Sequence, residues 1–379
     1  MSEPIYLDAH ATTPIDPRVL DEMLPWMRTP ANSHSAHAMG RAASLAVEEA
    51  RGQVAKLIGA DAEEIVFVPS ATIAANIALR SLGRPGTSAV RSAIEHPCVI
   101  ETLAALEPGI SVTEIAVDED GLVNPDDVEA AMGSATSLVA VMAVNNEVGT
   151  VQPIAEIGRL CEYLDVPLFV DLAQAAGRTP LNVRAAHISA GALSSHKLYG
   201  PQGIGALYCR RDLLPMMRAI ASGGGQERGL SPGTLPTALS VGFGASCRIA
   251  LEKLEEERSC IGALRDRLFS RLRVALPGVE INGSLENRVA GNLNLSFPGI
   301  EAEELLAHMS GVIASTGSAC SSGAMAPSPV LTAMGLPEGR IRGAVRFGIG
   351  RFTSQDEIDR AAALVIAAVN ALSVDAAKT

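Results

Sequence analysis

The chain carries Leu193-Ser194-Ser195-His196-Lys197-Leu198-Tyr199-Gly200-Pro201 between two apolar runs, residues 188–193 and 205–209. Each run has the length and composition of a buried strand, and the Gly-Pro pair favours a turn between them. A lysine directly after such a strand is either a surface residue at the strand end or a residue presented into a site. Taken alone, Lys197 favours the surface interpretation, whereas the rest of the chain favours the site.

Lys197 has neighbours that suit covalent chemistry. A lysine attacks a carbonyl when burial or a nearby cation lowers its pKa and frees the amine. The side chains of His196, Ser194 and Ser195 are suited to hold an anion such as a phosphate. An amine beside a phosphate-binding group is the arrangement that pyridoxal phosphate requires. The segment therefore predicts a lysine that forms a Schiff base with this cofactor.

The size and charge of the chain narrow the class of protein. Its 379 residues are enough for two domains, one larger than the other. The formal charge is -12, without a block of like charges that would suit a nucleic acid. Residues 1–7 lack the pattern of a targeting segment, and no apolar stretch reaches membrane-spanning length. We expect a cytoplasmic protein that binds neither a nucleic acid directly nor a membrane.

From residue 64 onward, short apolar runs alternate with helical segments, which predicts a mainly parallel sheet covered on both faces. The seven predicted strands are residues 65–68, 88–91, 111–117, 138–144, 168–170, 188–193 and 205–209. The predicted helices of this part are residues 18–27, 42–58, 74–82, 97–106, 125–132 and 154–164.

The C-terminal part predicts a smaller α+β unit, to which a short strand near Ile5 is added. Two helical segments, residues 236–254 and 255–276, lead into it. Its predicted strands are residues 293–297, 312–315 and 344–349, and its helices are residues 301–309 and 354–372. The expected domains are a large one, residues 16–255, and a small one that combines residues 1–15 and 256–379.

Polar residues follow four of the predicted strands, where ligands bind in parallel sheets. Thr72 begins a helix and suits a phosphate, and the turn at Asn146 suits a substrate. His96 suits acid–base work or stacking on a ring, and Asp171 suits a pyridinium nitrogen. Each residue alone is also explained as a helix cap or a loop residue. Because all four follow predicted strands and lie upstream of Lys197, together they favour a binding site.

The six cysteines are dispersed and form no CxxC pair, which argues against a structural zinc site and a disulfide framework. We therefore expect no metal. Five lie in apolar or helical contexts and are expected to be small packing residues. These five are Cys98, Cys161, Cys209, Cys247 and Cys260.

Cys320 lies in Ser318-Ala319-Cys320-Ser321-Ser322-Gly323, a composition typical of an accessible loop. It is either a thiol that is free to attack or an inert loop cysteine. Arg346 is a lone charge inside an apolar run. It is either an edge residue or a buried arginine that binds a carboxylate with two hydrogen bonds.

The sequence resembles the cysteine desulfurases of the class V aminotransferase family, which are pyridoxal phosphate enzymes of fold type I. The resemblance runs nearly from end to end. It extends to Arg346-Phe347, and its most specific motifs are Ser194-x-His196-Lys197-x-Tyr199-Gly200-Pro201 and Ser318-Ala319-Cys320. It implies an α/β fold with a mainly parallel seven-stranded sheet plus a smaller α+β domain that carries the cysteine loop.

The resemblance also implies roles for individual residues. Lys197, His96 and Cys320 are the expected catalytic residues. The expected cofactor-binding residues are Ala71, Thr72, His96, Asn146, Asp171, Gln174, Ser194, His196, Lys197 and Thr234. The expected substrate-binding residues are Asn32, Asn146 and Arg346. In the family, the residue that matches Thr234 reaches the phosphate of the partner subunit, which implies a homodimer.

The implied reaction converts L-cysteine to L-alanine and leaves a persulfide on Cys320. A sulfur-acceptor or scaffold protein then collects the sulfur for iron-sulfur cluster assembly or another thiolation pathway. One alternative is a selenocysteine lyase, for which Cys320 is dispensable with the preferred substrate. Another is a sulfur-handling scaffold that keeps the fold without turnover, which the presence of Lys197 and His96 disfavours.

Overall fold

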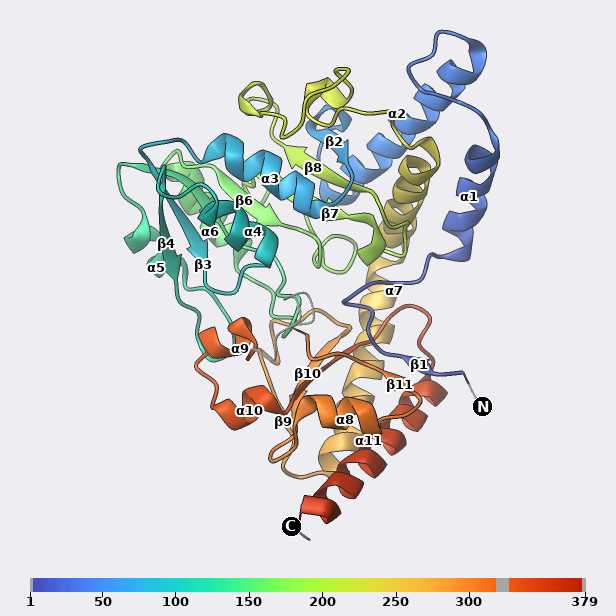
Figure 1. Cartoon of the computed structure of the whole chain (residues 1–379), viewed down its shortest axis with the longest axis vertical. Coiled ribbons are helices and arrows are strands. Elements are labelled where there is room, and N and C mark those ends of the chain that lie inside the picture. Colours follow the sequence, from blue (N-terminus) through green and yellow to red (C-terminus); the bar gives the residue numbers. More distant parts are fainter. Residues whose placement is uncertain (1–2, 318–326, 377–379) are drawn as a thin grey trace.

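The computed structural model describes residues 3–317 and 327–376. Its larger part is built on one seven-stranded sheet (Figure 1). Strand β8 is antiparallel to both of its neighbours, and the other adjacent pairs are parallel. The order across the sheet is β2 (Ile65–Val68), β8 (Gly205–Cys209), β7 (Ala190–Ser194), β6 (Leu168–Asp171), β5 (Thr136–Ala140), β3 (Ser88–Ser92) and β4 (Ser111–Ile115).

Helices cover both faces of this sheet because its strands are apolar on both sides. In β5, Leu138 packs with the helices α3 and α4, whereas Val139 packs into the opposite core with α2 and α6. The helices of this part are α1 (Pro17–Arg28), α2 (Ala38–Ile58), α3 (Ala71–Leu82), α4 (Pro97–Ala104), α5 (Pro125–Ala131) and α6 (Ile154–Tyr163). Short 3-10 turns span Ala62–Glu64, Ser195–Lys197, Leu214–Met216 and Glu227–Gly229.

The smaller part has its own apolar core around Leu293, Phe297 and Val365. An antiparallel sheet has the order β12 (Ala344–Gly348), β10 (Asn292–Ser296), β9 (Glu280–Ile281), and β1 (Ile5–Tyr6) pairs in parallel with β11 (Val312–Ile313). The helices are α8 (Ala302–His308), α9 (Pro329–Ala333), α10 (Glu338–Arg342) and α11 (Gln355–Ala376). Ile5 and Leu7 belong to this core, so the N-terminal strand lies with the C-terminal part.

A single helix, α7 (Thr237–Ala275), connects the two parts (Figure 1). The sequence predicted two helical segments that meet at residues 254 and 255, which is wrong. Residues 254–258 are Leu-Glu-Glu-Glu-Arg, all strong helix formers, so nothing ends the helix there. Phe243 packs into the core of the large sheet and Leu268 into the smaller core. The domain boundary predicted at residue 255 lies within this helix and stays a prediction.

Several bounds and environments differ from the sequence predictions. Strand β5 ends at Ala140 rather than at Val144, although the amides of Val141 and Ala143 still bond to carbonyls of β6. The two-residue strand β9 and the five-residue helices α9 and α10 were missed because they are too short to show periodicity. Cys260 is exposed on α7 and is not a packing residue, whereas Cys98, Cys161, Cys209 and Cys247 are buried.

Membrane-spanning helices are not found in the part of the chain that the structure describes. None of its helices combines the length and the apolar composition that crossing a bilayer requires.

Candidate active site

The carboxyl ends of five parallel strands meet at one edge of the large sheet, which is where ligands bind in this architecture. Each strand delivers a residue that the sequence singled out. Ala71 and Thr72 follow β2, His96 follows β3, Asn146 follows β5, Asp171 ends β6 and Ser194 ends β7. The topology therefore brings these residues to the same edge as Lys197, as expected from the sequence.

Lys197 lies at the end of the 3-10 turn Ser195–Lys197 that follows β7. Its Nζ donates hydrogen bonds to the backbone oxygens of His10, at 2.8 Å, and Ala11, at 2.6 Å. The N-terminal segment also holds the lysine turn through Thr13, whose Oγ1 donates to the His196 carbonyl and accepts the Tyr199 amide. The amine of Lys197 is thus placed by backbone oxygens from the far end of the chain.

His96 and Asp171 lie close together at the ends of their strands. One ligating atom of each side chain, together with the Cys98 sulfur, lies within 4.8 Å of the others. His96 caps α4, with its Nδ1 accepting the Cys98 amide, and an Asp171 oxygen accepts the Ala173 amide. An open cleft runs from His96 to Thr72. His96 lines this cleft, and Asp171 is buried close to His96.

Gln174 joins this group to the lysine. Its Nε2 donates to the same His10 carbonyl that accepts Lys197, and its Oε1 accepts a hydrogen bond from Arg178. Arg178 in turn donates to the carbonyl of Lys197 and that of Ala9. Burial lowers the pKa of Arg178, and the positive charge of Arg346 acts in the same direction. Arg178 thus fixes both Gln174 and the main chain of Lys197.

His196 is suited to donate a hydrogen bond as a neutral ring. Burial lowers its pKa to about 4, and the charges of Lys197 and Arg178 act in the same direction. The ring is therefore neutral near pH 7. Its Nδ1 lies 3.0 Å from the Thr12 hydroxyl. Ser194, which ends β7, is buried.

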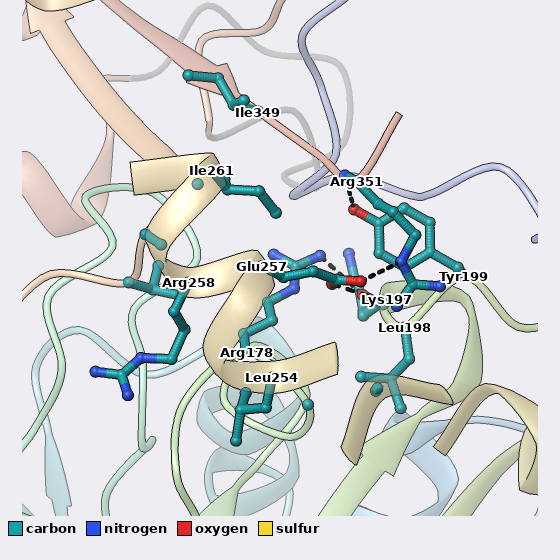
Figure 2. Close-up of a pocket in the computed structure, with 15 residues that line it drawn as sticks. Arg178, Lys197, Leu198, Tyr199, Leu254, Glu257, Arg258, Ile261, Ile349 and Arg351 are labelled. Carbon is teal, nitrogen blue, oxygen red and sulfur yellow. Dashed lines mark hydrogen bonds and ion pairs between the residues drawn. The ribbon is translucent and has the colours of Figure 1, made fainter. Parts of the chain in front are cut away.

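A second cavity is lined by Lys197, by residues of α7 such as Glu257 and by Ile349 and Arg351 of the smaller part (Figure 2). Arg351 donates to the Glu257 carboxylate on α7 and, through its backbone amide, to the hydroxyl of Tyr199. A further nitrogen of Arg351 donates to Asp16 at 2.7 Å. Through Arg351, these contacts connect Glu257 on α7 to Tyr199, which follows the turn that contains Lys197.

Arg346 is buried in β12 and is already held by polar groups. Its guanidinium donates to an Asp8 carboxylate oxygen at 2.8 Å, to the Asn146 carbonyl at 2.7 Å and to the Ser315 hydroxyl at 2.9 Å. Its Nε is buried without a hydrogen-bond partner among the described residues. Strand β12 is an outer strand of its three-stranded sheet, as the edge interpretation requires, but the Arg346 side chain is buried, with 3% of it exposed.

Three predicted site residues are not joined to this group within the described part of the chain. Asn32 is exposed, and its side-chain oxygen accepts the His34 amide within its own loop. Thr234 is exposed in the glycine-rich segment that precedes α7. Cys320 lies outside the described residues.

Sequence reasoning missed the residues that hold the lysine from a distance. His10, Thr13 and Arg178 give no local signal, because their partners lie more than a hundred residues away or in the backbone. Glu95, which directly precedes His96, was not singled out from the sequence. It is buried, and its burial raises the pKa of the carboxyl to about 8. Glu95 comes four residues after the end of the predicted strand, residues 88–91, and no pattern around it indicates a buried carboxyl.

A comparison with protein-family models finds one match, to the aminotransferase class-V family, over residues 5–361. The chain belongs to the class-V aminotransferase family. This family membership and the fold that it implies were predicted from the motifs around Lys197 and Cys320, and both predictions are confirmed.

Similar proteins of known name cover almost the whole chain. A human protein named cysteine desulfurase is 44% identical over 363 residues, which are 94% of this chain and 79% of the human one. A solved structure of a NifS-like protein superposes with a TM-score of 0.90 at 32% identity and covers 98% of this chain and 100% of that one. A structure described as SspA in complex with cysteine has a TM-score of 0.81 at 34% identity, over 92% of this chain and 99% of that one.

Proposed function

We propose that this member of the class-V aminotransferase family is a cysteine desulfurase that converts L-cysteine to L-alanine and passes the sulfur to Cys320. The observation that supports it best is the grouping of Lys197, His96 and Asp171 at one sheet edge, with Arg346 nearby in contact with the Asn146 carbonyl. The human relative that carries the name cysteine desulfurase is similar over 94% of the chain. SspA, a structural neighbour, was solved with cysteine bound.

The residues present fit pyridoxal phosphate. Lys197 offers a primary amine to the aldehyde, and the buried Asp171 offers a carboxylate to the pyridine nitrogen. Neutral His196, Ser194 and the start of α3 at Thr72 offer donors to a phosphate. When bound, the cofactor supplies an electron sink for the bonds to the substrate Cα.

The side chains of the chain itself then bind the substrate and move protons. Arg346 has a spare Nε donor for the substrate carboxylate. Because it faces the cleft, His96 is placed to take or return a proton near the ring. Lys197, whose amine donates to the same His10 carbonyl as Gln174, is the proposed second base, at the substrate Cα.

Sulfur transfer is the role of Cys320. Its thiolate attacks the substrate sulfur, so that an S–S bond forms as the substrate Cβ–S bond breaks. The electron pair of the broken bond stays with the carbon, and protonation of Cβ gives the methyl group of alanine. The products are alanine and a Cys320 persulfide, which a thiol of an acceptor protein can take over.

Three further proposals concern the assembly and the cell. A homodimer, in which Thr234 reaches the partner's phosphate site, fits the exposed position of this residue. A sulfur-acceptor or scaffold protein that feeds iron-sulfur cluster assembly or another thiolation pathway is the proposed partner. A cytoplasmic location is the third proposal, to be tested by cell fractionation.

Alanine and sulfide release from L-cysteine, with pyridoxal phosphate and a reductant, tests the function. We expect activity from the wild type and almost none from Lys197→Ala or Cys320→Ala. Lys197→Ala serves to show that any residual alanine is not formed at this site. Full activity of Cys320→Ala would favour the selenocysteine lyase alternative, and an inactive wild type with bound cofactor would favour the scaffold alternative.

A further inference from the structure

Glu147 is a buried carboxyl between the two segments that flank residues 318–326. On one side, the Ser328 hydroxyl donates to a Glu147 carboxyl oxygen at 2.5 Å. On the other side, a Cβ added to Gly317 would lie 3.4 Å from the Cβ and Cγ of Glu147. Glu147 and Ser328 are only 4% and 6% exposed. The Glu147 side chain therefore accepts a hydrogen bond from one flank of the segment that contains Cys320 and lies beside the other flank.

Both backbone groups of Glu147, the amide and the carbonyl, form hydrogen bonds with side chains. Its amide donates to the Asn145 side chain at 2.8 Å. Its carbonyl accepts hydrogen bonds from the side-chain amides of Asn292 and Asn294, both on β10 of the smaller sheet. A carboxyl with a backbone fixed in this way is a rigid support for whatever its side chain contacts.

The first flank is also tied to the substrate-binding candidate Arg346. Ser315 and Arg346 exchange two backbone hydrogen bonds, and the Ser315 hydroxyl donates to Asp8, the ion-pair partner of Arg346. Arg346 in turn donates to the carbonyl of Asn146, the residue before Glu147. Both flanks are thus fixed to the same turn, residues 145–147, at the end of β5.

We propose that Glu147 is a positioning residue for sulfur transfer, which holds the Ser328 and Gly317 flanks of the Cys320 segment against the turn that contacts Arg346. This inference rests on the proposed desulfurase function. It makes Glu147 act on the step at Cys320 rather than on cofactor binding, because none of its described hydrogen bonds involves Lys197, Asp171 or His196.

The carboxyl of Glu147 lies in an environment with opposing electrostatic effects. Burial raises the pKa of its carboxyl, while the Ser328 hydrogen bond and the charges of Arg346 and His96 oppose that shift. The Ser328 hydroxyl donates to a carboxyl oxygen in either protonation state. An amide at this position keeps the same acceptor, so Glu147→Gln preserves the contact and Glu147→Ala removes it.

The test compares Glu147→Ala, Glu147→Gln, Ser328→Ala and Ser328→Thr in the cofactor-loaded enzyme. Three quantities are measured: the cofactor absorbance, the dissociation constant for L-cysteine from the spectral change on binding, and the single-turnover rate of persulfide formation on Cys320. We expect the alanine variants to lose about tenfold in the persulfide rate, with cysteine binding changed by less than about twofold. Glu147→Gln and Ser328→Thr should retain most of the rate.

A double variant separates the contact from the loss of the α9 cap, because Ser328 also accepts the Leu331 amide. If the contact carries the effect, Glu147→Ala with Ser328→Ala is slowed little more than either single variant. Additive losses, or a parallel loss of cofactor absorbance and cysteine binding, would overturn the proposal in favour of a merely structural role.

Hydrogen exchange gives a readout that does not depend on activity. The amides of residues 315–317 and 328–333 should exchange faster in Glu147→Ala than in Glu147→Gln. If the wild type makes no alanine, the proposed function fails, and this exchange difference still decides whether Glu147 holds the flanks. Equal exchange in the two variants contradicts the inference.

Discussion

Glu95 is a buried carboxyl whose protonation makes stability depend on pH. One of its oxygens accepts the Ser92 hydroxyl at 2.5 Å and the Met142 amide at 2.7 Å. The other oxygen is buried without a hydrogen-bond partner among the described residues, which is where a proton fits. Burial raises the pKa of the carboxyl from 4.5 to about 8, and the negative charge of Asp171 adds to the shift.

Proton linkage gives the direction in which the free energy of unfolding changes with pH. Between about pH 5 and pH 8 the folded chain keeps the Glu95 proton and the unfolded chain loses it. The stabilisation by Glu95 is complete below the pKa that this carboxyl has in the unfolded chain, and it is lost as the pH rises through the pKa that it has in the folded chain. The free energy of unfolding therefore falls by up to about 1.4 kcal/mol per pH unit from this group. Glu95→Gln imitates the protonated form and should not show this loss.

The assay is guanidinium unfolding of the wild type and Glu95→Gln at several values between pH 5.5 and 7.5. Because other titrations are common to both proteins, the difference between their free energies isolates Glu95. Glu101→Gln, which removes an exposed carboxylate from α4, controls for the loss of one charge. The reasoning is refuted if the wild-type and Glu95→Gln curves run parallel over this range.

Two further predictions concern buried arginines. Two nitrogens of Arg51 donate to the two carboxylate oxygens of Glu227, each at 2.7 Å. Arg51→Met leaves this buried carboxylate without its cation and should lower the free energy of unfolding by about 3–5 kcal/mol, as measured with a denaturant. Adding Glu227→Leu to the same chain should restore much of the lost stability. No recovery in the double variant would count against the pair. Arg346→Lys should raise the KM for L-cysteine about tenfold with little change in cofactor absorbance, because an ammonium cannot replace the contacts to Asp8, Ser315 and Asn146 and also supply the further donor that the guanidinium Nε offers. An unchanged KM would exclude Arg346 as the carboxylate-binding residue.

Much of the fold followed from local pattern. The apolar runs at residues 65–68 and 205–209 are strands with the predicted bounds, because a buried strand is apolar on both faces and its flanking Gly and Pro residues mark its ends. Because the strands before His96 and Asp171, β3 and β6, both pair in parallel with β5, the position of these two residues at one edge of the sheet followed as well.

The remaining features depend on contacts between distant segments. The carbonyls of His10 and Ala11 hold Lys197 from nearly two hundred residues away, and a backbone acceptor leaves no trace in the sequence pattern. The continuity of α7 through residue 255 was missed because each half faces a different core, so its apolar stripe changes there. Glu147 appeared only as part of a polar turn, since its partner Ser328 belongs to another element.

The most direct test of the proposed function is mass spectrometry of the peptide that contains Cys320. The enzyme is incubated with L-cysteine without a reductant, alkylated and digested. We expect this peptide to gain one sulfur atom in step with alanine formation, dithiothreitol to remove that atom, and Lys197→Ala to prevent the gain. Alanine formed while the Cys320 peptide stays unmodified would contradict the account.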